Sequence, residues 1–525
     1  MEKKANIELD HSLKLIAKSS IIVFIGVLLS KLLSYFYKII VARNFGPETY
    51  GIFTLALIVI GVLITLASLG LPEGLLRFVA LYKGQKDIKK ATYLFKFSLI
   101  AIFISSIFFS ILLYVFAEQL SINFFHNADL TIYLKVLSLT IPLSALTSIF
   151  LSVLKGFQKV ALYSFIVNIF HNTLKVVLLF LFIIIGFKDK SLVYSYFFSA
   201  LGVLVISYLG VKSYLKKITA PEEINKNTKK KVLSELIVYS WPIIFLGAIT
   251  TLFYWIDSIV IGHFKGTAEV GFYNVVFTIV TLFGIAPELF MQLFFPIIVE
   301  HFSKNNLVTI REISKQVSKW IFIINVPLLL LMLLFPGAII NILFGADYLS
   351  GKNALIILAV GNFIGSLTIP LCNNLLSMKG KSKWILTNLI VASIFNLILN
   401  LIFVPKYGME GAAIITAATW ILLSLALLLE VRHLFSYVPL RKKMIRVFFV
   451  SLIPSIFLIA LSGTITKNLV SLIVAVSFFL IVYLFCIIVS GCLDNNDRII
   501  LSSIKNKLNV GFKSKNNYES APLQS

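Results

Sequence analysis

The sequence predicts an all-α polytopic membrane protein with fourteen transmembrane helices. Apolar residues make up 59% of the 525 residues, and charged residues make up only 13%, against about 25% in a typical soluble domain. The apolar residues come in long runs, and one helix needs about 20 of them to cross a bilayer. This composition excludes a soluble enzyme, a disordered chain and a secreted disulfide scaffold. It also excludes an outer-membrane barrel, whose strands alternate in short segments.

Polar residues divide the apolar runs into fourteen predicted spans. Several runs are longer than a bilayer requires, so tilted or kinked helices are expected. The spans are 16–43, 49–81, 91–117, 131–154, 160–186, 191–215, 232–263, 270–300, 317–344, 353–378, 384–405, 410–431, 444–466 and 469–491.

The distribution of Lys and Arg supports this division. With the N-terminus in the cytoplasm, 34 of the 47 Lys and Arg fall in segments predicted to lie inside, and 7 fall in outer segments. Cytoplasmic loops of membrane proteins carry this excess. Both termini are therefore predicted to be cytoplasmic. The net charge of +24 is explained by these cytoplasmic Lys and Arg, so we expect a multi-pass protein of the cell membrane and no nucleic-acid partner.

No feature of the sequence predicts catalysis. The longest loop, near 212–231, and the polar tail after 493 are too short for a catalytic domain. We find no phosphate-binding loop, nucleophile elbow or metal-ligand spacing, and the three cysteines form no motif. A polar stretch precedes the first span without a cleavage site, so no cleavable signal is expected. The protein is predicted not to be an enzyme and to need no cofactor.

An internal repeat relates the two halves of the chain. Phe45-Gly46-Pro47 through Gly51 recurs as Phe264-Lys265-Gly266 through Gly271, Pro72-Glu73 recurs as Pro287-Glu288, and Lys155-Gly156 recurs as Lys379-Gly380. Parallel repeats of this kind enclose a substrate site between two lobes. The predicted parts are an N-terminal lobe with a cationic interior (1–225), a C-terminal lobe (226–435), helices 13 and 14 (436–492) and a cytoplasmic polar tail (493–525).

Charged residues inside the predicted spans are candidates for function because they are costly at bilayer depth. The basic ones all lie in the N-terminal lobe, and the C-terminal lobe carries carboxylates instead. Lys96 and Lys135 lie near span ends, where their side chains reach the interface. Four basic residues are predicted to bind substrate: Lys31, Lys38, Arg77 and Lys175.

Two polar helix faces accompany these cations. Helical spacing places Ser34 and Tyr35 on one stripe with Lys31 and Lys38. Residues of the fifth span share a second face with Lys175. We predict that both faces line a water-filled cavity; the alternatives are a lipid-facing lysine and a contact between helices. Arg77 can instead pair with Glu73. The residues of the second face are Asn168, His171 and Asn172.

Asp257 and Glu288 are candidates for binding a coupling ion, Na⁺ or H⁺. Thr250, Tyr254 and Ser258 share a helix face with Asp257, and their oxygens would complete an ion site. The alternative is a static ion pair between a carboxylate and a lysine of the first lobe.

Parts of the sequence resemble a known family. The stretch from Lys31 through Gly46-Pro47 to Phe53 resembles the start of the polysaccharide transporters, the Wzx-like flippases of the multidrug/oligosaccharidyl-lipid/polysaccharide exporter superfamily. Gly408-Met-Glu-Gly411 and the turns at Gly156 and Gly380 are similar too, and the resemblance covers most of residues 12–490. It implies two lobes, alternating access to a central cavity that is often cationic, and translocation of lipid-linked oligosaccharides.

The prediction for function is a flippase that moves a polyprenyl-phosphate- or pyrophosphate-linked glycan precursor across the cytoplasmic membrane by alternating access. Its partners would be this substrate, membrane lipids and the enzymes of glycan biosynthesis. Alternatives are a peptidoglycan-precursor (lipid II) flippase and a cation-coupled multidrug exporter of the same superfamily. A membrane glycan polymerase, a glycosyltransferase and a structural scaffold are more remote.

Overall fold

The computed structural model describes residues 2–218, 225–460 and 469–492, and these residues form helices and short connections without any strand. The predicted tail 493–525 lies outside the described residues. The first helices are α1 (Glu2–Ala67), α2 (Leu71–Gly84), α3 (Ile88–Gln119), η1 (Leu120–Phe124), α4 (Leu130–Ser138), α5 (Thr140–Gly156), α6 (Val160–Ser164), η2 (Phe165–Phe170), α7 (His171–Ile185) and α8 (Lys190–Ile218). The later ones are α9 (Lys226–Lys265), α10 (Thr267–Val280), η3 (Thr281–Gly284), α11 (Ile285–Ser303), α12 (Leu307–Leu334), α13 (Pro336–Phe344), η4 (Ala346–Gly351), α14 (Lys352–Met378), α15 (Ser382–Phe435), α16 (Lys443–Ala460) and α18 (Leu469–Val489).

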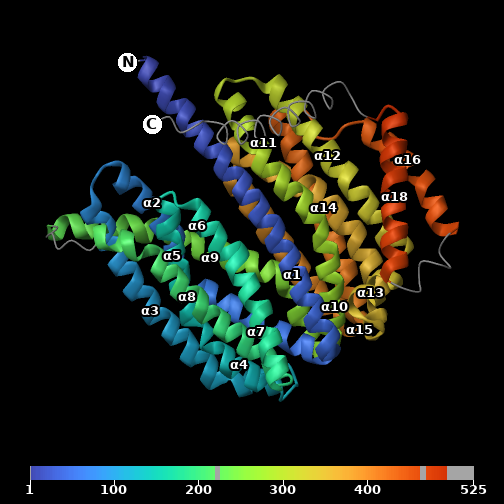
Figure 1. The fold of residues 1–525 in the computed structure, drawn as a ribbon, viewed down its shortest axis with the longest axis horizontal. Coiled ribbons are helices and arrows are strands. Elements are labelled where there is room, and N and C mark those ends of the chain that lie inside the picture. The colour runs from blue at the N-terminus through green and yellow to red at the C-terminus, as the bar shows by residue number, and fades with distance from the viewer. Residues whose placement is uncertain (1, 219–224, 461–468, 493–525) are drawn as a thin grey trace, which may run out of the picture.

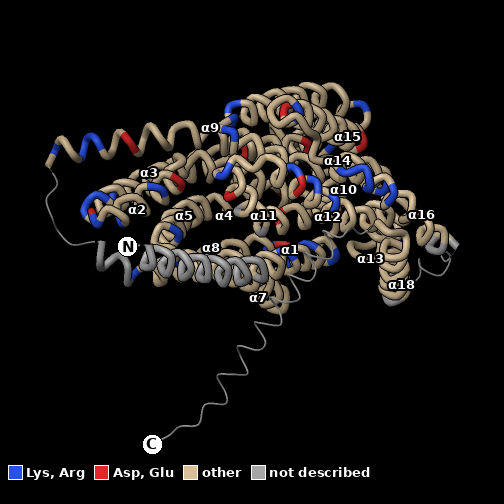
Figure 2. The backbone as a smooth tube through the Cα atoms, turned by 90° about the horizontal axis from the view of Figure 1, so that it is seen from above, with Lys and Arg blue, Asp and Glu red and all other residues tan. Residues whose placement is uncertain are grey.

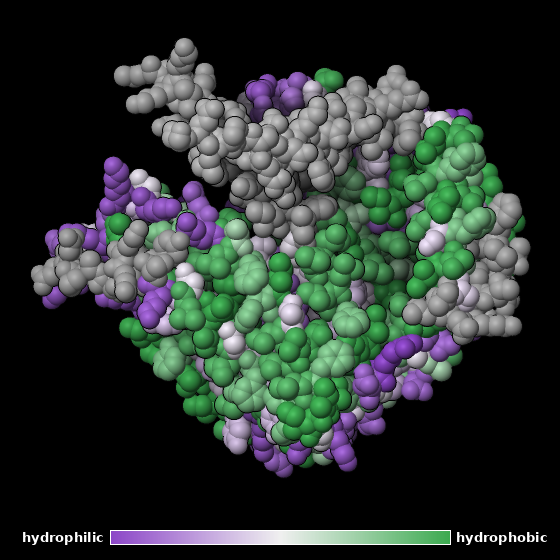
Figure 3. Space-filling view, in the orientation of Figure 1, coloured by the Kyte–Doolittle hydropathy of each residue, from purple (hydrophilic) through white to green (hydrophobic). Residues whose placement is uncertain are grey.

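The helices form a polytopic all-α membrane protein. Within the described residues, nine helices are long and apolar enough to cross a membrane, and the bent pair α4 and α5 makes a tenth. Two of these helices, α1 and α15, contain a kink at Gly46 and Gly408. Helix α15 holds two predicted spans, whereas α1 holds the first predicted span and the start of the second, 49–81, which continues in α2. Figure 3 shows hydrophobic side chains over the middle of the molecule and hydrophilic ones gathered toward its ends. The fold class is confirmed; the count of fourteen, the side of each terminus and the lobe boundaries stay predictions.

The helices gather into two groups. Figure 1 shows α2 to α8 on the left and α10 to α18 on the right, with α1 running between them. Helix α9 joins the groups: Leu236 belongs to the apolar core of α2, whereas Asp257 bonds to α15. We call the first group together with α1 the N-terminal half, and the second group together with the part of α9 after Pro242 the C-terminal half. Figure 2 shows Lys and Arg concentrated at α2 and at the start of α9.

The repeat in the sequence has a counterpart in the backbone. Gly46 and Gly266, which occupy equivalent places, have φ/ψ of 76°/174° and 87°/177°. L side chains rarely adopt such values, so glycine is required at both kinks. The equivalent glycines five residues later approach the opposite half: a Cβ on Gly51 would lie 1.8 Å from the Thr267 oxygen, and one on Gly271 would lie 2.0 Å from the Pro47 oxygen.

We call this reciprocal contact of residues 47–51 with residues 267–271 the outer seam, since the predicted topology puts it on the outer side. Further hydrogen bonds cross between the halves beside it. The Arg43 Nε donates to the Leu343 carbonyl at 3.0 Å, and the Tyr348 hydroxyl donates to the Ala42 carbonyl at 3.0 Å. The halves are therefore closed against each other at this end.

Helices α16 and α18 pack on α12 of the C-terminal half. The Tyr483 hydroxyl donates to the Ile323 carbonyl at 2.7 Å. Lys319 of α12 is fully buried and donates to the Cys492 carbonyl. These contacts fix the last two helices beside the repeat rather than within it.

Candidate functional site

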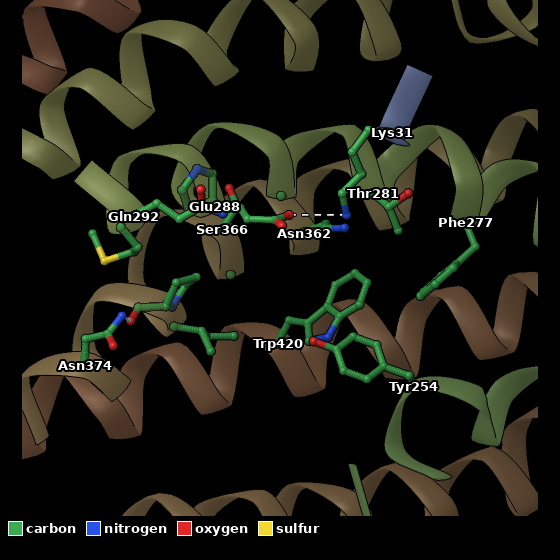
Figure 4. Close-up of a pocket in the computed structure, with 16 residues that line it drawn as sticks. Lys31, Tyr254, Phe277, Thr281, Glu288, Gln292, Asn362, Ser366, Asn374 and Trp420 are labelled. Carbon is green, nitrogen blue, oxygen red and sulfur yellow. Dashed lines mark hydrogen bonds and ion pairs between the residues drawn. The ribbon is translucent and has the colours of Figure 1, made fainter. Parts of the chain in front are cut away.

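A cavity of about 610 Å³ opens next to the contact between the two halves. Figure 4 shows Lys31 entering from α1, while the other labelled residues come from the C-terminal half. The cavity lies where the helix that starts at Thr267 changes to a 3₁₀ turn, η3, shortly before Pro287. A short 3₁₀ stretch and a proline both interrupt the regular hydrogen bonds of a helix. The polar residues of the lining are Lys31, Tyr254, Thr281, Glu288, Gln292, Asn362, Ser366, Asn374 and Trp420.

The predicted stripe of α1 faces the C-terminal half. Lys31 forms an ion pair with Glu288, with 3.2 Å between Nζ and Oε2. The hydroxyls of Tyr35 and Thr281 are 3.0 Å apart, and Lys38 donates to the Thr278 hydroxyl at 3.2 Å. Ser34 is half-buried on the same helix. The polar side chains of α1 therefore meet a matching polar row on α10, η3 and α11.

The second predicted face packs against α1. Asn172 donates to the Ser30 hydroxyl and Asn168 donates to the Ser164 hydroxyl, both at 2.9 Å. The Lys175 ammonium lies 5.4 Å from the centre of the Tyr37 ring, within the range of a cation–π contact. His171 is half-buried beside them. Asn172 thus joins α7 to α1, and the Tyr37 ring holds Lys175 toward α1.

The three lysines form one row of positive charge. Lys38 interacts electrostatically with Lys31, and Lys175 interacts with Lys38. Among the residues that the structure describes, no carboxylate lies within ion-pair distance of Lys38 or Lys175. We call Lys31, Lys38 and Lys175 the lysine row. Two cations near each other without a counter-ion are unfavourable in a nonpolar surrounding, so the row favours an anionic ligand.

Arg77 lies apart from this row. Its guanidinium lies over the ring of Tyr239 in α9, 4.4 Å from the centre. Both Arg77 and Glu73 are exposed on α2. The structure therefore places Arg77 at the contact between α2 and α9, and not in the lining of the cavity.

Asp257 forms a separate site inside the C-terminal half. Asp257 is only 4% exposed. The Tyr273 hydroxyl donates to Oδ2, the Thr416 hydroxyl donates to the same oxygen at 2.7 Å, and Asn400 donates to Oδ1 at 2.9 Å. Asn396 supports the group by donating to the Thr416 hydroxyl at 3.0 Å. The carboxylate is therefore held by neutral donors and not by a lysine.

The neighbours expected around Asp257 from its helix face differ from those observed. Thr250 donates to the Leu246 carbonyl, and Tyr254 lines the cavity. Ser258 accepts a hydrogen bond from Asn274. A helix face shows which residues of one helix share a direction, but the partners of Asp257 come from α10 and α15. The spacing of Asn396 and Asn400, four residues apart in an apolar span, was a signal that sequence reasoning could have used.

Comparison with protein families identifies the group to which the chain belongs. A family model described as polysaccharide biosynthesis protein matches residues 16–302, more than half of the chain. The chain belongs to this family. A second model, MatE, matches residues 242–402 of the chain, so the resemblance to the exporter superfamily is confirmed.

Named relatives of this family member are transporters. A putative O-antigen transporter of Shigella flexneri is 24% identical over 71% of this chain and 87% of its own. A probable low-salt glycan biosynthesis flippase, Agl15 of Haloferax volcanii, is 24% identical over 81% of this chain and 85% of its own. Among solved structures, the lipid II flippase MurJ in an inward closed conformation aligns with a TM-score of 0.69, at 18% identity, over 89% of this chain and 98% of its own. This last likeness shows the shared fold.

Proposed function

We propose that the protein is a flippase that moves a phosphate-bearing, lipid-linked glycan across the cytoplasmic membrane. The lysine row beside the cavity is the observation that carries this proposal. A lipid phosphate or pyrophosphate supplies the anionic group that Lys38 and Lys175 lack. The names of the two sequence relatives, an O-antigen transporter and a glycan biosynthesis flippase, support glycans as cargo and transport rather than catalysis.

The cavity suits the sugar part of such a cargo. Its volume of about 610 Å³ is typical of a ligand-binding pocket. The amides of Gln292, Asn362 and Asn374 offer donors and acceptors for hydroxyl groups, and the rings of Tyr254 and Trp420 offer flat apolar surfaces (Figure 4). A polar head group solvated in this way avoids the hydrocarbon while its lipid chain stays in the membrane.

Transport would proceed by alternating access between the halves. The outer seam is closed in this structure through Gly51 and Gly271, so the cargo would enter from the cytoplasmic side. Opening the seam would then release the cargo outside. With the N-terminus inside, this direction delivers a precursor made in the cytoplasm to the outer surface.

We also propose that Asp257 binds the coupling ion, Na⁺ or H⁺. Asp257 lies with hydroxyl and amide groups from α10 and α15, and the Asn400 Oδ1 is buried without a hydrogen-bond partner. Carboxylate, hydroxyl and amide oxygens together are suitable ligands for a hard cation. A carboxylate that is buried among neutral groups can alternatively take up a proton.

The other exporters of the superfamily are less consistent with the site. The MatE match suggests a multidrug exporter as an alternative. An exporter of cationic drugs would have to bind its positively charged cargo next to the positively charged lysine row. A lipid II flippase shares the fold, and its cargo also carries phosphate. The glycan relatives favour the oligosaccharide precursor over lipid II.

The proposal is tested by reconstituting the protein in liposomes with a fluorescent polyprenyl pyrophosphate that carries a short glycan. The probe should change leaflet when the protein is present, as measured by loss of quenching from outside. A cationic dye and a polyprenol glycan without phosphate are the controls. Movement of the dye in place of the pyrophosphate would indicate a drug exporter and contradict the proposal.

A further inference from the structure

The ion pair of Lys31 and Glu288 connects the two halves across the cavity. The side chains are 42% and 40% exposed, so a ligand in the cavity can reach both. Figure 4 shows the pair on the cavity wall, with Asn362 and Ser366 close to the Glu288 side chain. An ion pair of this exposure is weak enough to be exchanged for a better partner.

The position of the pair is distinctive. The contacts of Tyr35 with Thr281 and of Lys38 with Thr278 join α1 to η3 and α10, nearer to the outer seam. Lys31 and Glu288 therefore form the contact of this polar row that lies farthest from the seam. Loss of the pair would weaken the contact between α1 and α11 while leaving the outer seam intact.

The three lysines of the row differ in the groups that they already contact. Lys38 donates to a hydroxyl, and Lys175 contacts the ring of Tyr37, so an arriving anion meets no competing carboxylate there. At Lys31 the anion has to displace Glu288. The lysine row thus holds two lysines without a carboxylate partner, Lys38 and Lys175, and the one that lines the cavity, Lys31, is held by Glu288.

We propose that Glu288 determines specificity as an exchangeable counter-ion: it keeps Lys31 in the empty cavity and yields it only to a cargo with phosphate charge. This inference rests on the proposed function and extends it. A sugar hydroxyl does not replace a carboxylate on an ammonium group, because hydrogen bonds between charged partners are the stronger ones. A phosphate or pyrophosphate carries equal or greater charge and replaces it.

The exchange of Glu288 for phosphate on Lys31 also allows the cargo to change the conformation of the two halves. When phosphate takes Lys31, the ion pair between α1 and α11 is lost, and the freed Glu288 carboxylate lies on the wall that holds Gln292 and Asn362. A ligand changes a conformational equilibrium only through different affinity for the two states. A phosphate that breaks the ion pair would bind the state without the pair more tightly than the state with it. A neutral glycolipid would bind both states equally.

A binding experiment with two matched probes tests the counter-ion. The full chain in nanodiscs is titrated with farnesyl pyrophosphate and with farnesol, which has the same chain without charge. Glu288→Gln should bind the pyrophosphate about fivefold more tightly, because Lys31 is no longer held. Lys31→Gln should bind it about tenfold more weakly, and Lys31→Gln/Glu288→Gln should equal Lys31→Gln. Farnesol binding should stay unchanged throughout.

Glu300→Gln is the matched control, because it removes the carboxylate of another ion pair on α11, that with Lys304 on the surface. It should leave both affinities unchanged. The counter-ion proposal is overturned if Glu288→Gln, in protein that unfolds at the wild-type temperature, leaves the affinity for pyrophosphate unchanged or lowers it. It is also overturned if Glu288→Gln raises this affinity in the Lys31→Gln variant as well. If the wild type binds farnesol as tightly as the pyrophosphate, the proposed function itself fails; if only the Glu288 prediction fails, that function stands.

Discussion

The two halves carry charges of opposite sign near equivalent kinks. Tyr37 lies nine residues before the kink at Gly46, and Asp257 lies nine residues before the kink at Gly266. The contacts correspond as well: Lys175 lies over the Tyr37 ring, whereas Asn400 donates to Asp257. One half thus presents lysines without a carboxylate, and the other presents a carboxylate held by neutral donors.

This difference shows how one repeated scaffold supports two kinds of site. The kinked helices and the amides Asn172 and Asn396, each sixteen residues after its glycine turn, recur in both halves. The lysine row and Asp257 do not recur, because their equivalent places hold uncharged residues. The shared parts determine where a site can form, and the few exchanged side chains determine the sign of the ligand that it attracts.

The parallel orientation of the halves gives the largest expected contrast. Cysteines at the exposed positions Asp189 and Lys265 should react with an impermeant thiol reagent in intact cells, and those at Gln85 and Asn305 should not. The two positions of each set belong to different halves. If only one of the two inner positions, Gln85 or Asn305, were labelled from outside, the halves would have opposite orientations. That result would contradict the parallel repeat.

Removal of the two unpaired lysines should nearly abolish transport. Lys38→Met/Lys175→Met loses two charge-assisted hydrogen bonds to phosphate, which predicts about a 100-fold decrease in probe translocation. Its thermal unfolding temperature should be unchanged or higher, because two like charges are removed. Lys96→Met, near a span end, is the control. A loss of stability together with activity would indicate that the lysines support the fold.

Asp257→Asn should separate ion coupling from cargo binding. The amide keeps the shape of the carboxylate and removes its charge, so transport should fall about tenfold and lose its response to an imposed Na⁺ or H⁺ gradient. Binding of the pyrophosphate probe should stay at the wild-type level. A wild type that ignores both gradients would contradict coupling and leave Asp257 as a structural partner of Tyr273 and Thr416.

The glycines of the outer seam should give the smallest effects, and these should be equal. In Gly51→Ala or Gly271→Ala the new methyl meets a backbone oxygen of the other half, which should cost the closed seam roughly 1–3 kcal/mol. A cysteine placed at Ala268, beside the seam, should then label faster from outside. Gly61→Ala, with open space around it, is the control. Unequal effects in the two glycine variants would show that the seam is not symmetric in energy.

The sequence alone predicted the membrane class, the repeat and the polar stripe of α1. Long apolar runs allow few structures other than spanning helices, because every backbone polar group has to be satisfied without water. The stripe at Lys31, Tyr35 and Lys38 follows from helical periodicity alone, and the structure places all three toward the C-terminal half. The equivalent glycines Gly46 and Gly266 could be aligned in the sequence, and the structure has a kink at each.

Only the tertiary structure decided which charges meet. Glu288 and Asp257 were equal candidates for pairing with a lysine, and the structure joins Glu288 to Lys31 and surrounds Asp257 with Tyr273, Asn400 and Thr416. Arg77 was grouped with the other cations, and it lies over Tyr239 instead. Periodicity fixes the direction of a side chain on its own helix, but its partner depends on how distant helices pack, and no local pattern in the chain encodes that arrangement.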